Sequence, residues 1–238
     1  MRKVFCLLPL AFLAVQALSQ KTINDEHVEA RTVSSSFKAI EVSSGIDLYL
    51  SQGDEAVAVS AKEERVKQNI RTEVDGNVLK IYFKRTEGIK MNWNTKGPIK
   101  VYVSCKELNS LIVSGGSDVI IVDKFRTKDM SINISGGADL RGKIECDYLS
   151  LVQSGGSDVT MTGLITKLRL RTSGGSDFDG DGLSTDICDI EASGGSDVSV
   201  TVNKELTAEA SGASDVHWKG TATVKSVRAS GAGSVKHK

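Results

Sequence analysis

The 238-residue chain is poor in proline, with two residues, and in aromatic side chains, with six Phe, four Tyr and two Trp. Its 30 basic and 30 acidic side chains cancel, so it lacks the excess of positive charge on which nucleic-acid binding depends. Composition therefore argues against a nucleic-acid partner and against polybasic membrane binding. At this length, with 39% hydrophobic residues, we expect one ordinary core or one elongated domain.

Cysteine and histidine are scarce as well. After removal of a targeting segment the chain would keep Cys105, Cys146 and Cys188, an odd number without a C-x-x-C spacing, which argues against a disulfide framework or a zinc site and favours buried thiols. There are three histidines and no G-x-S-x-G motif. We therefore predict no catalytic residues, no cofactor and no enzyme activity.

The only long apolar run lies at the N-terminus. Arg2 and Lys3 precede an uncharged stretch over residues 4–18 that ends in small residues, as in a signal peptide. The run is about 15 residues long, and a bilayer-spanning helix needs roughly 20. We predict a signal peptide over 1–19, a linker over 20–30, and a protein exported to the periplasm, the cell surface or the medium without a permanent membrane anchor.

The 23 glycines are periodic rather than scattered. A Ser-Gly-Gly-Ser-Asp motif or a close variant begins at Ser114, Ser135, Ser154, Ser173, Ser193, Ser211 and Ser230. Successive copies are 21, 19, 19, 20, 18 and 19 residues apart, so each copy marks one structural unit. The turn glycines that we expect to reverse the chain, commonly with positive φ, are Gly115, Gly116, Gly136, Gly137, Gly155, Gly156, Gly174, Gly175, Gly194, Gly195, Gly212 and Gly231.

Apolar and polar residues alternate between these turns, for example in Leu168-Arg-Leu-Arg-Thr172. Such segments are short, half-buried strands, and stacking each unit on the one before buries their apolar faces in a continuous core. The sequence therefore predicts an all-β fold, a parallel β-solenoid with about 19 residues per coil. It would form a single domain over 31–238, irregular over 31–104 and regular over 105–238.

The irregular part repeats some of these features. Ser43-Ser-Gly-Ile-Asp47 resembles the repeated turn and indicates that the same stack begins here. The charged segment 62–70 favours one or two helical turns, Asp75-Gly-Asn77 a hairpin turn, and 86–98 a loop excursion.

The chain resembles the bacterial family of putative auto-transporter adhesins with a head GIN domain. The resemblance rests on Val33 to Val42 with Phe37, Ile46-Asp-Leu-Tyr-Leu50, Gln52-Gly-Asp54, Thr72-Glu-Val74 with Gly76 and Leu79, the spaced turns, and Trp218-Lys-Gly220. It implies an exported, right-handed parallel β-helix with two main sheets, similar in outline to pectin-lyase-like folds but without their catalytic residues. It also implies adhesion as the role.

Two groups of acidic residues could hold cations. Stacking would align Asp118, Asp139, Asp158, Asp177, Asp197 and Asp215 in one column about 5 Å apart, where turn N–H groups or Ca²⁺ ions could offset the repulsion. In addition, Asp177, Asp179 and Asp181 match the first half of a calcium loop. Alignment with Thr160 and Thr162 instead predicts that Asp179 and Asp181 are outward residues of a strand, with Phe178 inward. Solvated acids are the favoured interpretation, and a Ca²⁺ site is the alternative.

Two tryptophans remain as candidate contact residues. Trp218 alternates with polar neighbours and is expected to point inward, whereas Trp93 is the candidate for recognition of a partner. We predict an exported adhesin-like binding or scaffold protein whose partner is a surface protein or a glycan, with self-association as a further possibility. A polysaccharide-active lyase or hydrolase is the alternative function.

Overall fold

The computed structural model describes residues 25–84 and 97–238, and almost all of its regular structure is β-strand. The only helix is α1 (Glu64–Lys67), a single turn, in the part of the chain so described. The strands are β1 (Val28–Arg31), β2 (Ala39–Val42), β3 (Asp47–Gln52), β4 (Ala56–Ser60), β5 (Ile70–Asp75), β6 (Val78–Phe83), β7 (Lys100–Cys105), β8 (Ser110–Val113), β9 (Val119–Arg126), β10 (Asp129–Ile134), β11 (Leu140–Gln153), β12 (Asp158–Thr172), β13 (Asp177–Ala192), β14 (Asp197–Ala210), β15 (Asp215–Lys219), β16 (Thr223–Ala229) and β17 (Ser234–His237).

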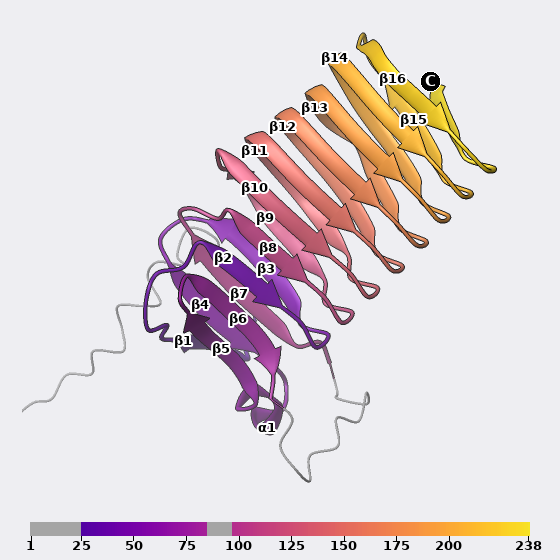
Figure 1. The fold of residues 1–238 in the computed structure, drawn as a ribbon. Coiled ribbons are helices and arrows are strands. Elements are labelled where there is room, and N and C mark those ends of the chain that lie inside the picture. Colours follow the sequence, from indigo (N-terminus) through magenta and orange to yellow (C-terminus); the bar gives the residue numbers. More distant parts are fainter. Residues whose placement is uncertain (1–24, 85–96) are drawn as a thin grey trace, which may run out of the picture.

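The strands wind into a β-solenoid of about seven turns spaced about 19 residues apart, which confirms the predicted fold class. Figure 1 shows the coils stacked along one axis with the Gly-rich turns aligned at one edge. Sheet I, as we call it, contains β1, β4, β7, β3, β9, the first halves of β11 to β14, β15 and β17, in that order. Sheet II contains β5, β6, β2, β8, β10, the second halves of β11 to β14, and β16.

The core lies between the two sheets, where residues in matching positions of successive coils form columns. In one column of sheet II, Leu149, Leu168, Cys188 and Leu206 follow one another in register and are all buried. The predicted burial of the thiols is correct for all three described cysteines, which are free and buried. Burial raises the pKa of each thiol to about 12, so these groups stay protonated and pack as apolar side chains.

The N-terminal part joins the stack out of sequence order. The coil made by β2 and β3 lies between the coil made by β6 and β7 and the coil made by β8 and β9. Ser43 to Asp47 does form a turn in line with the later ones, and the Ile46 N–H donates to the Ser117 hydroxyl at 3.0 Å. Four strands of this part, β2, β3, β6 and β7, therefore belong to the parallel stack.

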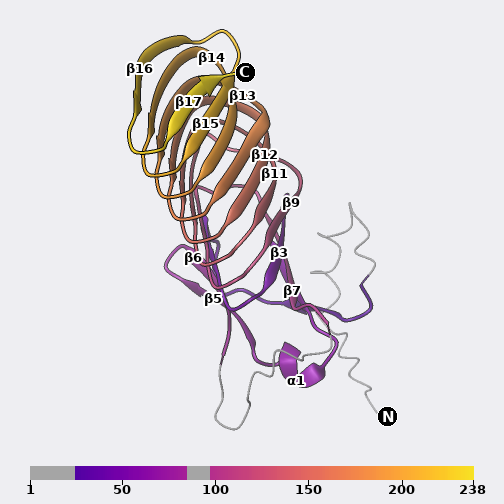
Figure 2. The same ribbon diagram turned by 90° about the vertical axis from the view of Figure 1, so that its right-hand side faces the viewer.

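The remaining strands of the N-terminal part, β1, β4 and β5, run antiparallel to their neighbours. The predicted hairpin is present, with Asp75 opposite Val78 and a positive φ at Gly76. Of the segment 62–70, for which one or two helical turns were predicted, only the single turn α1 is helical. These elements close one end of the solenoid. At the other end lies the coil of β16 and β17, and no other described strand pairs with its outer edge (Figure 2).

Candidate functional site

The aligned turns form the most regular surface of the molecule. The first glycine of every Ser-Gly-Gly/Ala turn has a φ between +65° and +88°, a backbone conformation that side chains with a Cβ disfavour. Turn backbones also bond from coil to coil, for example from the Gly175 N–H to the Gly155 carbonyl at 2.9 Å. The turns are therefore one hydrogen-bonded column rather than separate loops.

The second turn glycines divide into two groups. Gly116 and Gly137 have positive φ, whereas Gly156, Gly175 and Gly195 do not. Alanine takes this place in the last two turns, as Ala213 and Ala232. The expectation of a positive φ is therefore wrong for those three glycines.

The fourth residue of the turn is a buried serine in most copies. Ser157, Ser176, Ser196 and Ser214 are fully buried, and each hydroxyl donates to the carbonyl of the serine that opens its own turn, at 2.7–3.1 Å. These bonds satisfy the buried hydroxyls within their own turns. The serines are thus structural, as a turn role predicts.

The aspartates at the fifth turn position form the expected outward column, which Asp47 of β3 extends by one coil. Turn N–H groups offset part of their repulsion, since Asp118, Asp139 and Asp177 each accept an N–H from the next coil rather than from their own turn. Asp118 Oδ1 accepts the N–H of Asp139 at 3.3 Å, and Asp139 Oδ1 accepts the N–H of Asp158 at 3.2 Å. Burial raises the pKa of Asp47, and the neighbouring Asp118 adds to the rise.

This rise in pKa leads to a testable prediction for Asp47→Asn. Because the folded state favours the protonated carboxyl, the wild-type protein loses stability relative to the variant as pH rises from below the unfolded value, near 3.8, through the folded pKa. We expect the variant to have the higher urea midpoint at pH 7 and an equal midpoint at pH 3. A variant that is less stable at pH 7 would show that the charge of Asp47 stabilises the turn.

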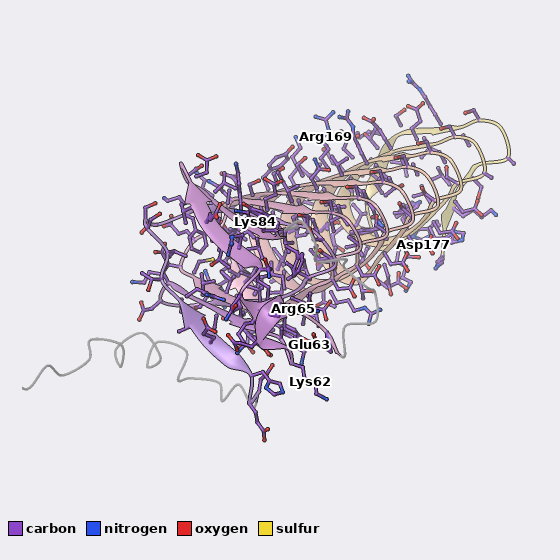
Figure 3. The ribbon with its side chains drawn as sticks, turned by 90° about the horizontal axis from the view of Figure 1, so that it is seen from below. Lys62, Glu63, Arg65, Lys84, Arg169 and Asp177 are labelled. Carbon is purple, nitrogen blue, oxygen red and sulfur yellow. The ribbon has the colours of Figure 1, made fainter. Side chains whose placement is uncertain are left out.

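Asp177, Asp179 and Asp181 all point outward from β13, as predicted. Figure 3 shows Asp177 on a different side of the stack from Arg169. Asp181 pairs with Lys219 at 2.8 Å, and this hydrogen bond lowers the pKa of the Asp181 carboxyl. Asp179 Oδ1 accepts the N–H of Asp181 at 3.0 Å. Within 25–84 and 97–238, no three His, Cys, Asp or Glu side chains gather in a geometry that could hold a metal ion.

The alignment of Asp181 with Thr162 is wrong. A bulge in β13 places Gly182 opposite Thr162 and leaves Asp181 one position out of register. The bulge turns the Asp181 carboxylate toward Lys219, two coils away, which explains the ion pair.

A groove of about 460 Å³ lies where the coils pass from sheet I to sheet II, bordered by Arg126, Glu145, Leu164 and Asp186 among others. Glu145 bonds to Arg126 at 2.8 Å and to Lys124 at 2.9 Å, and these bonds lower the pKa of its carboxyl. A general acid needs a raised pKa to hold its proton near neutral pH. The charge arrangement therefore makes Glu145 a structural partner of two basic side chains.

The outward face of sheet I carries an apolar strip that sequence reasoning missed. Tyr102 of β7, Tyr49 of β3 and Ile120 of β9 follow one another in register, and the two tyrosine rings stack with their centroids 5.1 Å apart. Ile120 and Val122 are each 38% exposed. We call these four residues the tyrosine strip.

Neighbouring polar groups hold the strip in place. The Tyr102 hydroxyl donates to Asp25 at 2.9 Å, and burial together with this bond raises the pKa of Tyr102. Lys100 Nζ lies 5.9 Å from the centre of the Tyr49 ring, within reach of a cation–π interaction. The alternation in Leu48-Tyr-Leu50 and Val101-Tyr-Val103 places both tyrosines outward, but only the pairing of β3 with β7 shows that they meet.

The structure tests only one of the two tryptophan predictions. Trp218 is inward and 9% exposed, and its ring lies 4.1 Å from that of His237, centroid to centroid. Trp93 lies outside the described residues, as do the signal-peptide segment 1–19 and most of the predicted loop 86–98.

None of the described helices is long and apolar enough to cross a bilayer. Comparison with curated proteins gives no match. Comparison with solved structures gives several matches, and the three described next are below 25% identity, which establishes likeness of fold.

A putative adhesin from Bacteroides fragilis superposes with a TM-score of 0.80 at 21% identity, over 89% of this chain and 96% of its own. A putative lipid binding protein from Parabacteroides distasonis gives 0.68 at 20% identity, over 91% and 98%. A putative adhesin from Parabacteroides merdae gives 0.63 at 15% identity, over 90% and 97%.

The family model described as putative auto-transporter adhesin, head GIN domain, matches residues 36–222. The match covers the irregular N-terminal coils as well as all the regular ones up to β15. This chain therefore belongs to the family of putative auto-transporter adhesins with a head GIN domain.

Proposed function

We propose that this protein is an exported, non-enzymatic binding module that attaches to a surface protein through the tyrosine strip. The observation that carries the proposal is the strip itself, because two half-buried tyrosines and two exposed aliphatic side chains lie together on an otherwise polar face. Aromatic residues are enriched in protein interfaces, and a few of them supply most of the binding energy. Family membership and the adhesin-like neighbours support the same conclusion.

The geometry of the strip favours a protein over a glycan. The two tyrosine rings stack on each other along the column, with an interplanar angle of 29°, so each covers a face of the other and their edges are directed outward. Sugar rings dock best on exposed ring faces, whereas side chains of a protein pack readily against ring edges and the aliphatic Ile120 and Val122. The stacked rings and the hydrogen bond of Tyr102 hold the strip in one conformation before a partner binds. Binding therefore costs less conformational entropy.

The test compares substitutions at two isoleucines of similar exposure on opposite sheets. Ile120 is 38% exposed on sheet I, and Ile112 is 41% exposed on sheet II. Beads coated with the full chain would be measured for attachment to a panel of immobilised extracellular proteins and glycans. We expect Ile120→Lys to weaken attachment to a protein target about tenfold or more, while Ile112→Lys binds as the unmodified protein does.

Three results would contradict the proposal. Equal loss in both variants would show that the strip has no special part in attachment. Attachment to glycans alone would point to another ligand class, and turnover of a polysaccharide by the full chain would favour the enzyme alternative.

A further inference from the structure

The two ends of the solenoid are built differently. At the N-terminal end, Glu29 and Arg31 of β1 lie opposite the buried Val59 and Val57 of β4, so charged side chains continue apolar columns. Arg31 pairs with Glu29 at 3.0 Å and donates to the Lys67 carbonyl of α1 at 3.0 Å. This end is closed by charge and by a helical turn, a common protection against strand pairing.

Within residues 25–84 and 97–238, no strand or helix covers the C-terminal coil in this way. Val224 and Val227 of β16 continue the columns of Leu206 and Ala208, which are fully buried one coil earlier. The two valines are 46% and 42% exposed. Ala229 of β16 and Val235 of β17 continue two further columns. We call these four side chains, with the outer edges of β16 and β17, the open end; Figure 2 shows the position of the two strands at the end of the stack.

The charged side chains that face outward beside the open end, among neutral Thr and Ser side chains, are basic. They are Lys225 and Arg228 on β16 and Lys236 on β17. Inside the stack a basic side chain commonly meets an acid on the next coil, as Arg171 meets Glu191 at 2.8 Å. Lys225 bonds back to Glu205 at 3.3 Å, but across the described coils Arg228 and Lys236 form no ion pair.

We propose that the open end binds an extended segment of an acidic partner, which pairs with β16 as an additional strand of sheet II. Apolar side chains of that segment would cover Val227 and Ala229 in the regular part of β16, and an Asp or Glu side chain between them would lie beside Arg228. Backbone hydrogen bonds supply the affinity in this mode of recognition, and the alternating side chains supply the specificity. The site lies at the opposite end of the molecule from the tyrosine strip and does not depend on the proposed function.

The basic side chains also argue against a second copy of this chain as the partner that pairs with β16. Antiparallel pairing of β16 with its own copy about Arg228 would place the Arg228 side chains of the two copies opposite each other, and like charges on paired strands are destabilising. A bulge at Lys225 leaves Ser226 to Ala229 as the regular pairing segment. A partner strand would align with that segment first.

The experiment uses the full chain and a labelled synthetic peptide of alternating valine and glutamate, with a valine–lysine peptide of equal length as control. Fluorescence anisotropy measures affinity, and hydrogen exchange locates the protected amides. We expect the glutamate peptide to bind at least about tenfold more tightly than the lysine peptide and to protect the amides of β16.

Two variants sharpen the result. Arg228→Glu should reverse the preference between the peptides, and Arg228 lies on an exposed edge. Lys167→Glu, an exposed basic residue within sheet II, should leave the preference unchanged.

Several outcomes would overturn the proposal. These are no measurable binding of the glutamate peptide, equal binding of both peptides, or protection outside β16. Protection of β16 without peptide, accompanied by a size that grows with protein concentration, would assign the open end to a second copy instead.

Discussion

Replacing Gly174 by alanine is expected to destabilise the solenoid by about 3 kcal/mol or more, whereas the same change at Gly175 is expected to be harmless. Gly174 has a φ of +85°, and a Cβ there would lie 2.5 Å from the Gly155 carbonyl oxygen of the preceding coil. Both obstacles are backbone, so no side-chain rotation relieves them. The turn column would have to open at this coil.

Gly175 is a matched control one residue away. It lacks a positive φ, and a Cβ at this position would meet nothing within 4 Å. Alanine restricts the unfolded chain more than glycine does, so Gly175→Ala should be neutral or should stabilise by about 0.4–1 kcal/mol.

Urea denaturation followed by circular dichroism would measure both effects. Similar losses of stability in the two variants would mean that the turn tolerates no side chain at all and that φ is not the deciding factor. A wild-type midpoint in Gly174→Ala would mean that the turn can change conformation without affecting the stack.

The sequence predicts the coil well because the coil repeats. Ser-Gly-Gly turns at fixed spacing, with alternating residues between them, define a local unit that can be buried only by stacking. Cys188 and Trp218 could be placed inward from alternation alone, since each takes a position that leucine or valine holds in neighbouring coils. Such predictions need only the register of one coil on the next.

The stacking order of the N-terminal coils could not be predicted in the same way. The coil of β2 and β3 precedes that of β6 and β7 in sequence but follows it in the stack, and the strands between them run antiparallel. Parallel strands with similar inward residues can pair in more than one order. Ile40, Leu79 and Leu111, which follow one another in one column, are nearly interchangeable in size and polarity. Long-range packing, rather than local pattern, decides between them.

The same limit applies to the candidate site. Tyr49 and Tyr102 are 53 positions apart, and nothing in either strand's own pattern brings their rings together. The ion pair of Asp181 likewise depends on a bulge that shifts register by one residue, a change that an alternating pattern does not reveal. Side chains that act together across coils become visible only once the pairing of strands is known.

Phe178 and Gly180 form a second pair of this kind, and we expect their substitutions to be strongly coupled. Phe178 lies in the column of Val159 and Val198, all buried, and Gly180 lies opposite Val200. A Cβ on Gly180 would come within 2.6 Å of the Phe178 ring. The ring therefore occupies space that the missing side chain of Gly180 leaves free.

Each single change should lower the stability of the fold, one by leaving a cavity and the other by overpacking. Phe178→Val leaves a cavity, for which we expect a loss of about 2–3 kcal/mol, and Gly180→Val forces a side chain into the ring, for which we expect a loss of about 1–3 kcal/mol or more. The double variant restores the valine pair that Val198 and Val200 already form one coil later. The double variant should lose about 2 kcal/mol less stability than the sum of the two single losses.

A double-mutant cycle from urea denaturation of the four proteins measures this coupling. Additive losses would show that the ring and the glycine are independent and that Phe178 could be accommodated on any coil. Recovery in the double variant would instead show that one coil can exchange a large and a small inward residue for two of middle size, because the core responds to the summed volume at each level of the stack rather than to the identity of a single side chain.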